Sequence, residues 1–242
     1  MFDHVTIRVS DGEASERFYA TVLAPLRIER SHSGPDLAEW DVFSLAAAEA
    51  GHPPTTNLHI GFAAPSRPEV DAFWRAGVDA GHPEDGEPGP RPQYREDYYG
   101  SFLRDPDDNS AEAVHHGVAH RRRVIDHLWL RVADVAAARA FYETIAPHAG
   151  FDIRVHGPDH VQCSAATGSF SLVAGDRPTE NAHIAFPAMG VGAVDAFHAA
   201  AVGAGYRDNG APGERARYHP GYYGAYVLDP DGNNIELVHH AR

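Results

Sequence analysis

The sequence predicts an α+β fold made of two tandem copies of one module. Residues 98–116 and 222–240 are identical at 11 of 19 positions, at an offset of 124 residues. The same offset relates His59 to His183, and an offset of 123 relates Asp3-His4 to Asp126-His127. Each copy also alternates segments of period 2 with segments of helical period. So many matches with one change of register indicate an internal duplication.

The first half of each copy reads as a strand, a helix and further strands. Residues 4–9 alternate polar and apolar side chains, which is typical of a half-buried strand. The sequence Ser10-Asp11-Gly12-Glu13 predicts a helix start of the capping-box type. An apolar stripe follows at helical spacing, at Phe18, Tyr19, Val22 and Leu23. Residues 37–48 are strand-like again.

The second half repeats this order. A strand is expected from Asn57 to Phe62, and Ser66-Arg67-Pro68-Glu69 predicts the next helix start. A loop rich in proline and glycine, 82–92, precedes two strands joined by a tight turn at 105–108. In the second copy this turn is Asp229-Pro230-Asp231-Gly232, where glycine accepts positive φ without strain.

These patterns divide the chain into a first domain at 1–118 and a second at 124–242. Residues 119–123, with the basic stretch His120-Arg121-Arg122-Arg123, read as a solvated linker.

The composition limits the partners. The formal net charge is −14, which disfavours nucleic acid and anionic membrane surfaces. No run of 18 apolar residues is present, so no spanning helix is expected. The single cysteine, Cys163, excludes an internal disulfide and a cysteine-rich zinc site. The chain opens directly on a strand pattern without a leader, so a cytoplasmic location is expected.

Two histidines and one glutamate recur at matching positions of both copies, and they are the candidate metal ligands: His4, His59 and Glu112, then His127, His183 and Glu236. Taken singly, a strand histidine is more often a surface or core residue. Two imidazoles and one carboxylate bind one side of a divalent ion and leave the other side open. Such an ion can bind two substrate oxygens, or one substrate atom and dioxygen.

The strand opening Asp-His, the segment His-Ile-(Gly/Ala)-Phe and the run Asp-Pro-Asp-Gly-Asn-Asn-Ile-Glu-Leu resemble the vicinal oxygen chelate superfamily over nearly the whole chain, twice. That group includes lactoylglutathione lyases, extradiol dioxygenases, thiol transferases and bleomycin-binding proteins. The resemblance implies that each domain consists of two βαβββ units forming a half-open barrel around a metal site. By position, it implies that the six candidate residues are metal ligands. Fe(II) or Mn(II) is the expected ion, and Ni(II) or Zn(II) is also compatible.

The resemblance does not single out one reaction, because features of two branches of the superfamily are matched only in part. The lyase branch adds a glutamate on the fourth strand, where this chain has Ser44 and Ser171. The dioxygenase branch places a tyrosine ten residues before the carboxylate ligand, which corresponds to Tyr226 in the second copy and to Phe102 in the first. A proton-carrying histidine of that branch corresponds roughly to His219, where the first copy has Arg95. Another histidine of that branch has no match, because Gly168 falls near its place.

The second copy is therefore the better equipped one, with Tyr226 as donor and His219 as proton carrier. Core packing of Tyr226 is an equal alternative. His116 and His240 share the face of the glutamates, but as strand-end residues they are expected on an exposed rim.

Two functions remain open. The first is a metal-dependent enzyme, either an oxygenase or an isomerase, lyase or transferase, acting on a small substrate with neighbouring oxygens. The second is a drug-binding protein of the bleomycin-resistance type, without catalysis. A homodimer is compatible with both, and each barrel could close within one copy or by exchange of units.

Overall fold

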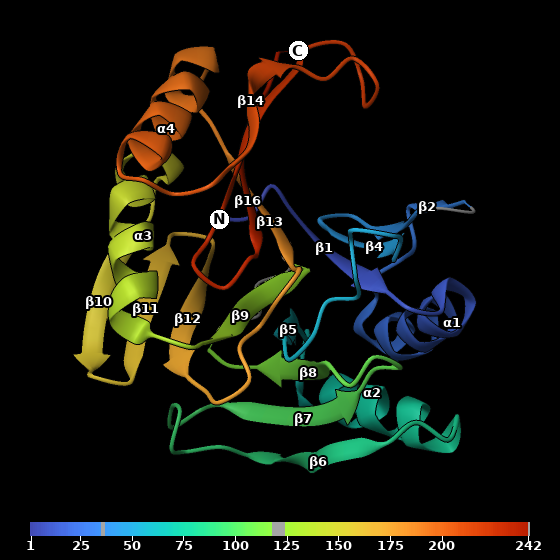
Figure 1. Ribbon diagram of the computed structural model, residues 1–242. Helices are drawn as coiled ribbons and strands as arrows, with labels where there is room; N and C mark the ends of the chain where they lie inside the picture. Colours follow the sequence, from blue (N-terminus) through green and yellow to red (C-terminus); the bar gives the residue numbers. More distant parts are fainter. Residues whose placement is uncertain (35–36, 118–123, 242) are drawn as a thin grey trace. The chain divides into compact units, whose positions relative to one another are not determined.

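The computed structural model describes residues 1–34, 37–117 and 124–241 (Figure 1). The chain divides into two units: unit 1 comprises Met1–Thr6 and Leu130–Arg242, and unit 2 comprises Ile7–Trp129. Strands β1 (His4–Val9) and β9 (Ile125–Val132) each contribute residues to both units. The linker expected at 119–123 lies outside the described residues.

Unit 2 contains helices and strands in the order expected for the first copy. They are α1 (Gly12–Leu23), η1 (Ala24–Leu26), β2 (His32–Ser33), β3 (Leu37–Trp40), β4 (Phe43–Ala47), β5 (His59–Ala63), α2 (Arg67–Asp79), β6 (Glu84–Pro90), β7 (Tyr99–Arg104) and β8 (Ser110–His115). The strands follow the spatial orders β9-β5-β8-β7-β6 and β4-β3-β2. Helix α1 packs against α2.

Unit 1 has the matching set of elements. They are α3 (Val135–Ala149), β10 (Asp152–Gly157), β11 (His160–Ala165), β12 (Gly168–Ala174), β13 (His183–Pro187), α4 (Val191–Gly203), β14 (Asp208–Glu214), β15 (Tyr222–Leu228) and β16 (Asn234–His240). The spatial orders are β14-β15-β16-β13-β1 and β10-β11-β12. Figure 1 shows α4 next to the upper end of α3 in this unit, and the two helices are in contact. The α+β fold predicted from the repeat is confirmed.

Helices α1 and α3 begin at aspartate caps. Asp11 accepts a hydrogen bond from the N–H of Ala14 at 2.9 Å, so the cap of α1 is Asp11 rather than Ser10. Asp134 caps α3 in the same way, accepting from Ala136 and Ala137. Glycine ends α3, because Gly150 adopts φ 72°.

The two Asp-Pro-Asp turns fix the last strand of each unit. The buried carboxylate of Asp229 accepts hydrogen bonds from the backbone N–H groups of Asp231 (3.0 Å) and Asn233 (2.8 Å). Its second oxygen accepts from Tyr142 of α3 at 3.2 Å. The amide of Asn233 bridges to the segment before β13, accepting from Ala182 N–H at 3.1 Å. The turn therefore places β16 beside β13 at a defined register.

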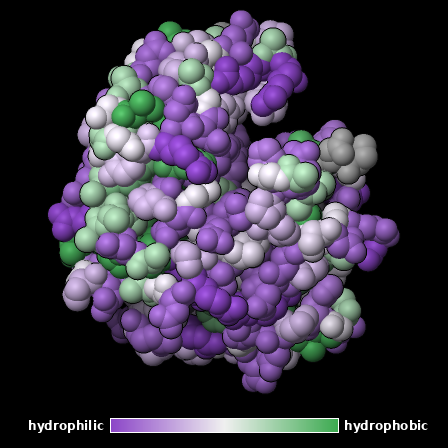
Figure 2. All heavy atoms as spheres, viewed as in Figure 1, coloured by the Kyte–Doolittle hydropathy of each residue, from purple (hydrophilic) through white to green (hydrophobic). Residues whose placement is uncertain are grey.

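The surface visible in Figure 2 is mainly hydrophilic, with hydrophobic residues in small groups. None of the helices in the described part of the chain is long and apolar enough to cross a membrane.

Candidate metal centres

In unit 1, strand register brings three predicted ligands to one face of the sheet. His4 on β1 lies opposite Ala185 on the antiparallel β13, and Ala185 lies opposite Glu236 on the parallel β16. His183 precedes Ala185 by two residues, and side chains two apart on a strand point to the same face. His4, His183 and Glu236 form the unit 1 site.

The potential ligand atoms of the unit 1 site converge. Nε2 of His4 lies 2.9 Å from Nε2 of His183, and the two nitrogens lie 3.5 and 3.1 Å from Oε2 of Glu236. Ligands held about 2.1 Å from an ion at right angles lie about 3.0 Å apart. The observed spacings therefore match three corners of a coordination polyhedron.

Unit 2 repeats this arrangement with Gly61 in place of Ala185. Gly61 on β5 lies opposite both Glu112 on β8 and His127 on β9, and His59 precedes it by two residues. Nε2 of His59 lies 2.9 Å from Oε2 of Glu112 and 3.3 Å from Nε2 of His127. His59, Glu112 and His127 form the unit 2 site, and each site has three members among the residues that the structure describes.

The first-strand histidines are exchanged between the sequence copies. His4 joins two ligands of the second copy, and His127 joins two ligands of the first. The grouping of one complete set per copy is thus wrong, and the alternative of exchange describes the observed arrangement. The physical reason is that β1 pairs with β13 and β9 pairs with β5.

The two exchanged histidines are each oriented by a carboxylate at Nδ1, the ring nitrogen that faces away from the other ligands. Oδ1 of Asp3 lies 2.9 Å from Nδ1 of His4, and Oδ1 of Asp126 lies 3.0 Å from Nδ1 of His127. Each Nδ1–H then donates to a carboxylate, which leaves the Nε2 lone pair facing the other ligands. The Asp-His pairs recur in the sequence, and this repetition was the available signal for the role of the aspartates.

Tyrosines hold the two glutamates. The hydroxyl of Tyr222 donates to Oε1 of Glu236 at 2.7 Å, and that of Tyr98 donates to Oε1 of Glu112 at 2.7 Å. Each glutamate is 1% exposed, and its other oxygen, Oε2, faces the two imidazoles. Both tyrosines belong to the Tyr-Tyr-Gly segment that recurs in the two copies.

The sites favour ionised carboxylates. Burial raises the pKa of Glu112, but hydrogen bonds from His127 and His59 outweigh this effect and lower it to about 2. Burial likewise opposes charge on Glu236, whose pKa is lowered by His183 and His4. An anionic oxygen held beside two imidazole nitrogens is a donor set suited to a divalent transition metal.

Three glycines make room for the ligands. A Cβ on Gly61 would lie 2.4 Å from Cε1 of His127, so a side chain there would displace the ring. A Cβ on Gly224 would lie 2.5 Å from Oε1 of Glu236, and Gly100 stands in the same relation to Glu112. Gly100 and Gly224 recur at matching positions of the two copies, and this repetition is the sequence signal for their role.

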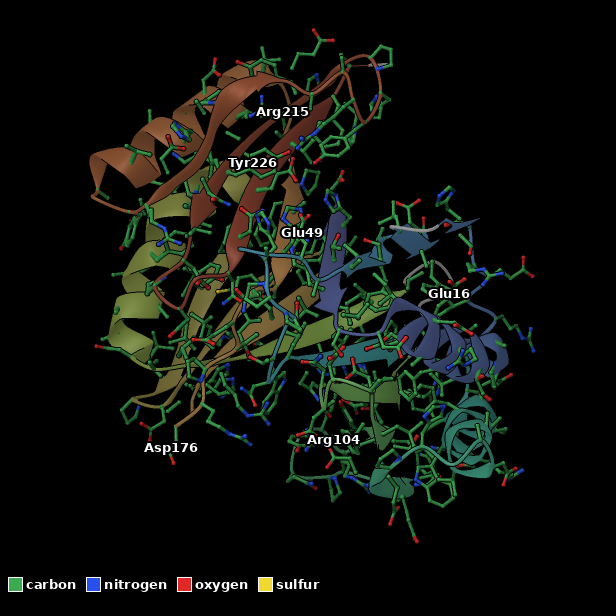
Figure 3. All side chains as sticks on the ribbon, turned by 45° about the vertical axis from the view of Figure 1, so that its right-hand side comes forward. Glu16, Glu49, Arg104, Asp176, Arg215 and Tyr226 are labelled. Atoms are coloured by element: carbon green, nitrogen blue, oxygen red, sulfur yellow. The ribbon has the colours of Figure 1, made fainter. Side chains whose placement is uncertain are left out.

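Tyr226 lies beside the unit 1 site. It is opposite Glu236 on the neighbouring strand, its ring centroid is 6.2 Å from that of His183, and it is 9% exposed. Its buried hydroxyl has no hydrogen-bond partner among the described residues. Figure 3 shows Arg215 close to Tyr226, and the guanidinium carbon lies 5.4 Å from the ring centroid. Phe102 takes the equivalent position in unit 2, 5.9 Å from the ring of His59.

His219 is not in contact with a ligand of the unit 1 site. It is exposed on the loop before β15, where its Nε2 lies 2.9 Å from Nδ1 of His240. His240 and His116, expected on an exposed rim, are partly buried and bind Asp3 (3.0 Å) and Asp126 (3.1 Å). The rim prediction was wrong because both rings turn back toward the aspartates behind the ligands.

Comparison with known structures agrees with this fold. Glyoxalase I from Zea mays matches with a TM-score of 0.70 and 20% identity, over 99% of this chain and 92% of that one. A putative dioxygenase from Bacillus subtilis subsp. subtilis str. 168 matches with a TM-score of 0.64 and 15% identity, over 100% of this chain and 85% of that one. A search of curated proteins found no match.

The family comparison covers both halves of the sequence. The family model described as Glyoxalase/Bleomycin resistance protein/Dioxygenase superfamily matches residues 1–113 and again residues 124–237. Each match includes one copy of the repeat, with its two histidines and its glutamate. The chain therefore belongs to the Glyoxalase/Bleomycin resistance protein/Dioxygenase superfamily.

Proposed function

We propose that this protein is a divalent-metal-dependent enzyme acting on a small molecule that binds through two neighbouring oxygens. The observation that carries the proposal is the convergence of two Nε2 atoms and one Oε2 atom within 3.5 Å of one another in unit 1. A site that only sequesters a drug by shape has no need of such a donor set. Fe(II) and Mn(II) suit two imidazoles and one carboxylate best, and Ni(II) or Zn(II) are also compatible.

His4, His183 and Glu236 would hold the ion in unit 1, and His59, Glu112 and His127 would hold it in unit 2. When bound, the ion supplies Lewis acidity toward substrate oxygens on its open side. Side chains of the protein position the ligands. Asp3 fixes the Nδ1–H tautomer of His4, and Tyr222 keeps Oε1 of Glu236 occupied so that Oε2 stays turned to the imidazoles.

We assign the chemistry to unit 1, with Tyr226 and His219 as its active side chains. The unpaired hydroxyl of Tyr226, next to His183 and Glu236, is placed to donate a hydrogen bond to a substrate oxygen that gains negative charge. Burial and the charge of Glu236 raise the pKa of Tyr226, which keeps the hydroxyl protonated as a donor. His219 is proposed as the proton carrier of this unit. Unit 2 has Phe102 and Arg95 at these positions and lacks both functions.

The test begins with elemental analysis after dialysis of the untagged protein against Mn(II), Fe(II), Ni(II) or Zn(II). We expect two ions per chain. Vicinal diols, hydroxyketones and thiol adducts are then screened, with dioxygen uptake recorded, for wild type, Glu236→Gln and Glu112→Gln. Glu236→Gln should abolish turnover and Glu112→Gln should retain most of it. Binding of a ligand without bound metal and without turnover would favour the drug-binding alternative instead.

A further inference from the structure

Behind ligand His4, a chain of side chains runs outward to the surface of unit 1. Oδ1 of Asp3 lies 2.9 Å from Nδ1 of His4, and Oδ2 of Asp3 lies 3.0 Å from Nε2 of His240. Nδ1 of His240 lies 2.9 Å from Nε2 of His219. The chain ends where Nδ1 of the exposed His219 donates to the carbonyl oxygen of Pro220 at 2.8 Å. Each contact is within hydrogen-bond distance, so the ligand and the surface are connected without a gap.

The hydrogen bonds of this chain require one extra proton. Both ends of the His240–His219 pair face oxygens that only accept, namely the Asp3 carboxylate and the Pro220 carbonyl. The two rings must therefore provide an N–H at each end and a third between them. Two neutral imidazoles carry two N–H groups in total, so the hydrogen-bonded pair holds one proton more and carries one positive charge, which balances the Asp3 carboxylate.

Unit 2 contains the same chain with a different outer member. Asp126 lies 3.0 Å from Nδ1 of His127 and 3.1 Å from Nε2 of His116, and Nη1 of Arg95 lies 3.5 Å from Nδ1 of His116. Arginine keeps its charge at every pH at which the protein is folded. Here a neutral His116 satisfies both neighbours, and the charge of Arg95, which is paired with Asp97 at 2.7 Å, does not change with pH.

We propose that His219 and His240 form a proton-carrying pair that sets, through Asp3, the charge behind His4, so that two sites with identical ligands respond differently to pH. The proposal rests on the proposed function only in assuming that these ligands bind a divalent ion. His219 and His240 act here as positioning residues. When the pair releases its proton to water from the exposed His219, one N–H bond is broken and the charge that balances Asp3 is lost.

The sign of the effect follows from electrostatics. Without the extra proton, the full negative charge of Asp3 acts on the Nδ1–H of His4, which makes His4 a stronger donor to a cation. Loss of a nearby positive charge also reduces repulsion of the ion. Affinity in unit 1 should therefore increase as the pair deprotonates, whereas in unit 2 the charge of Arg95 does not change.

Other titratable and charged side chains lie around the His219–His240 pair. Tyr222 of β15 lies against both rings, with centroids 5.4 Å from His219 and 5.1 Å from His240. Glu214 at the end of β14 accepts from Gly221 N–H at 3.3 Å, next to Pro220. The same loop carries Tyr218 and Arg217, which bond each other. Asp3 and Glu214 are thus the acidic groups around the pair and Arg217 is the basic one, and Asp3 alone is hydrogen-bonded to it directly.

The experiment uses the full chain with one site disabled at a time. In the Glu112→Gln background, Co(II) affinity is measured by competition from pH 5.5 to 8.5, with and without His219→Arg. We expect Co(II) affinity in the single-site protein to rise about tenfold over this pH range, and we expect this rise to be absent in His219→Arg. Tenfold is the lower end of the effect on metal affinity that groups hydrogen-bonded to metal ligands typically have. In the Glu236→Gln background, Arg95→His should create a similar gain in unit 2. His156→Arg makes the same substitution at an exposed position that is not part of this hydrogen-bonded series, and it should leave the pH profile of Co(II) affinity unchanged.

A second measurement needs no metal. The ring nitrogens of His240 are followed by ¹⁵N NMR in the metal-free protein, and we expect a titration between pH 5.5 and 8.5 that disappears in His219→Arg, where His240 stays neutral like His116. An unchanged His240 titration in His219→Arg, or equal Co(II) profiles with and without it, would overturn the proposal. Absence of Co(II) binding together with the expected NMR result would refute the metal function and leave the proton pair standing.

Discussion

At the scale of single residues, the two sites differ most clearly at Tyr226 and Phe102. Replacing Tyr226 by Phe removes the one buried hydroxyl near the unit 1 ligands that has no partner in the described part of the chain. Loss of a donor to developing negative charge typically costs about 10² in kcat. We expect this loss in Tyr226→Phe with unchanged metal affinity. Phe102→Tyr is the reciprocal control in unit 2, and it should leave turnover in unit 1 unaltered. Wild-type turnover in Tyr226→Phe would reduce Tyr226 to a packing role.

Gly61 offers a second residue-scale prediction. A methyl group at this position would lie 2.4 Å from the ring of His127, which is held by Asp126 and Glu112. Gly61→Ala should therefore lower metal affinity in unit 2 by about 10-fold or more, because the ring must leave its orientation. Unit 1 has alanine at the matching position, so Ala185→Gly should leave its affinity unchanged. Isothermal titration of both variants, each with the other site disabled, measures the difference.

The identity of the ligands could be predicted from the sequence, whereas their grouping could not. His4 and His127 lie near the starts of strands of the same alternation, and both potential partner strands begin with His-Ile. Nothing in the local pattern distinguishes β13 from β5 as the neighbour of β1, since pairing is decided by contacts remote in sequence. The role of Tyr222 depends on this same long-range geometry, through a hydrogen bond spanning 14 residues to Glu236.

At the scale of elements, the Asp-Pro-Asp turn is sensitive to pH. Burial raises the pKa of Asp229 from 3.8 to about 6, despite hydrogen bonds from Asn233 that lower it. A carboxyl that holds its proton more tightly in the folded state stabilises the protein below pH 3.8, and this contribution is lost as the pH rises through about 6.

Urea unfolding of the metal-free protein between pH 4 and 7 tests this behaviour. Relative to Asp229→Asn, the free energy of unfolding of the wild type should fall by ~1–3 kcal/mol across this range, as a shift of about two pKa units implies. Asp176→Asn, an exposed substitution in the same unit, should follow the wild-type curve. Parallel curves for wild type and Asp229→Asn would show that the turn carboxylate is ionised throughout.

The turn itself was predictable because its chemistry is local. Proline, aspartate and glycine fix the backbone over four residues, and the sequence Asp-Pro-Asp-Gly contains all that is required. The helix starts were likewise predictable to within a residue. The bridge from Asn233 to Thr179 and Ala182 was not, because it joins segments about fifty positions apart.

At the scale of the whole molecule, the central prediction concerns which ion is lost in His4→Ala. Because His4 faces His183 and Glu236, this variant should lose the ion of unit 1 and keep the one bound by His59, Glu112 and His127. Co(II) shifts the ring signals of the histidines that bind it, so the signals of His59 and His127 should still respond and that of His183 should not. Loss of the response at His59 instead would restore the grouping by sequence copy.

The exchange of the first strands also constrains how this duplicated gene can change. Each half encodes two ligands of one site and the third ligand of the other, so neither half retains a complete centre when the other loses its opening histidine. A single copy would hold two ligands of one site and the opening histidine of the other, so it would need a second copy to complete a centre. Positions such as Phe102 and Tyr226 or Arg95 and His219, outside the shared ligand sets, are where the halves can specialise while each still depends on the other.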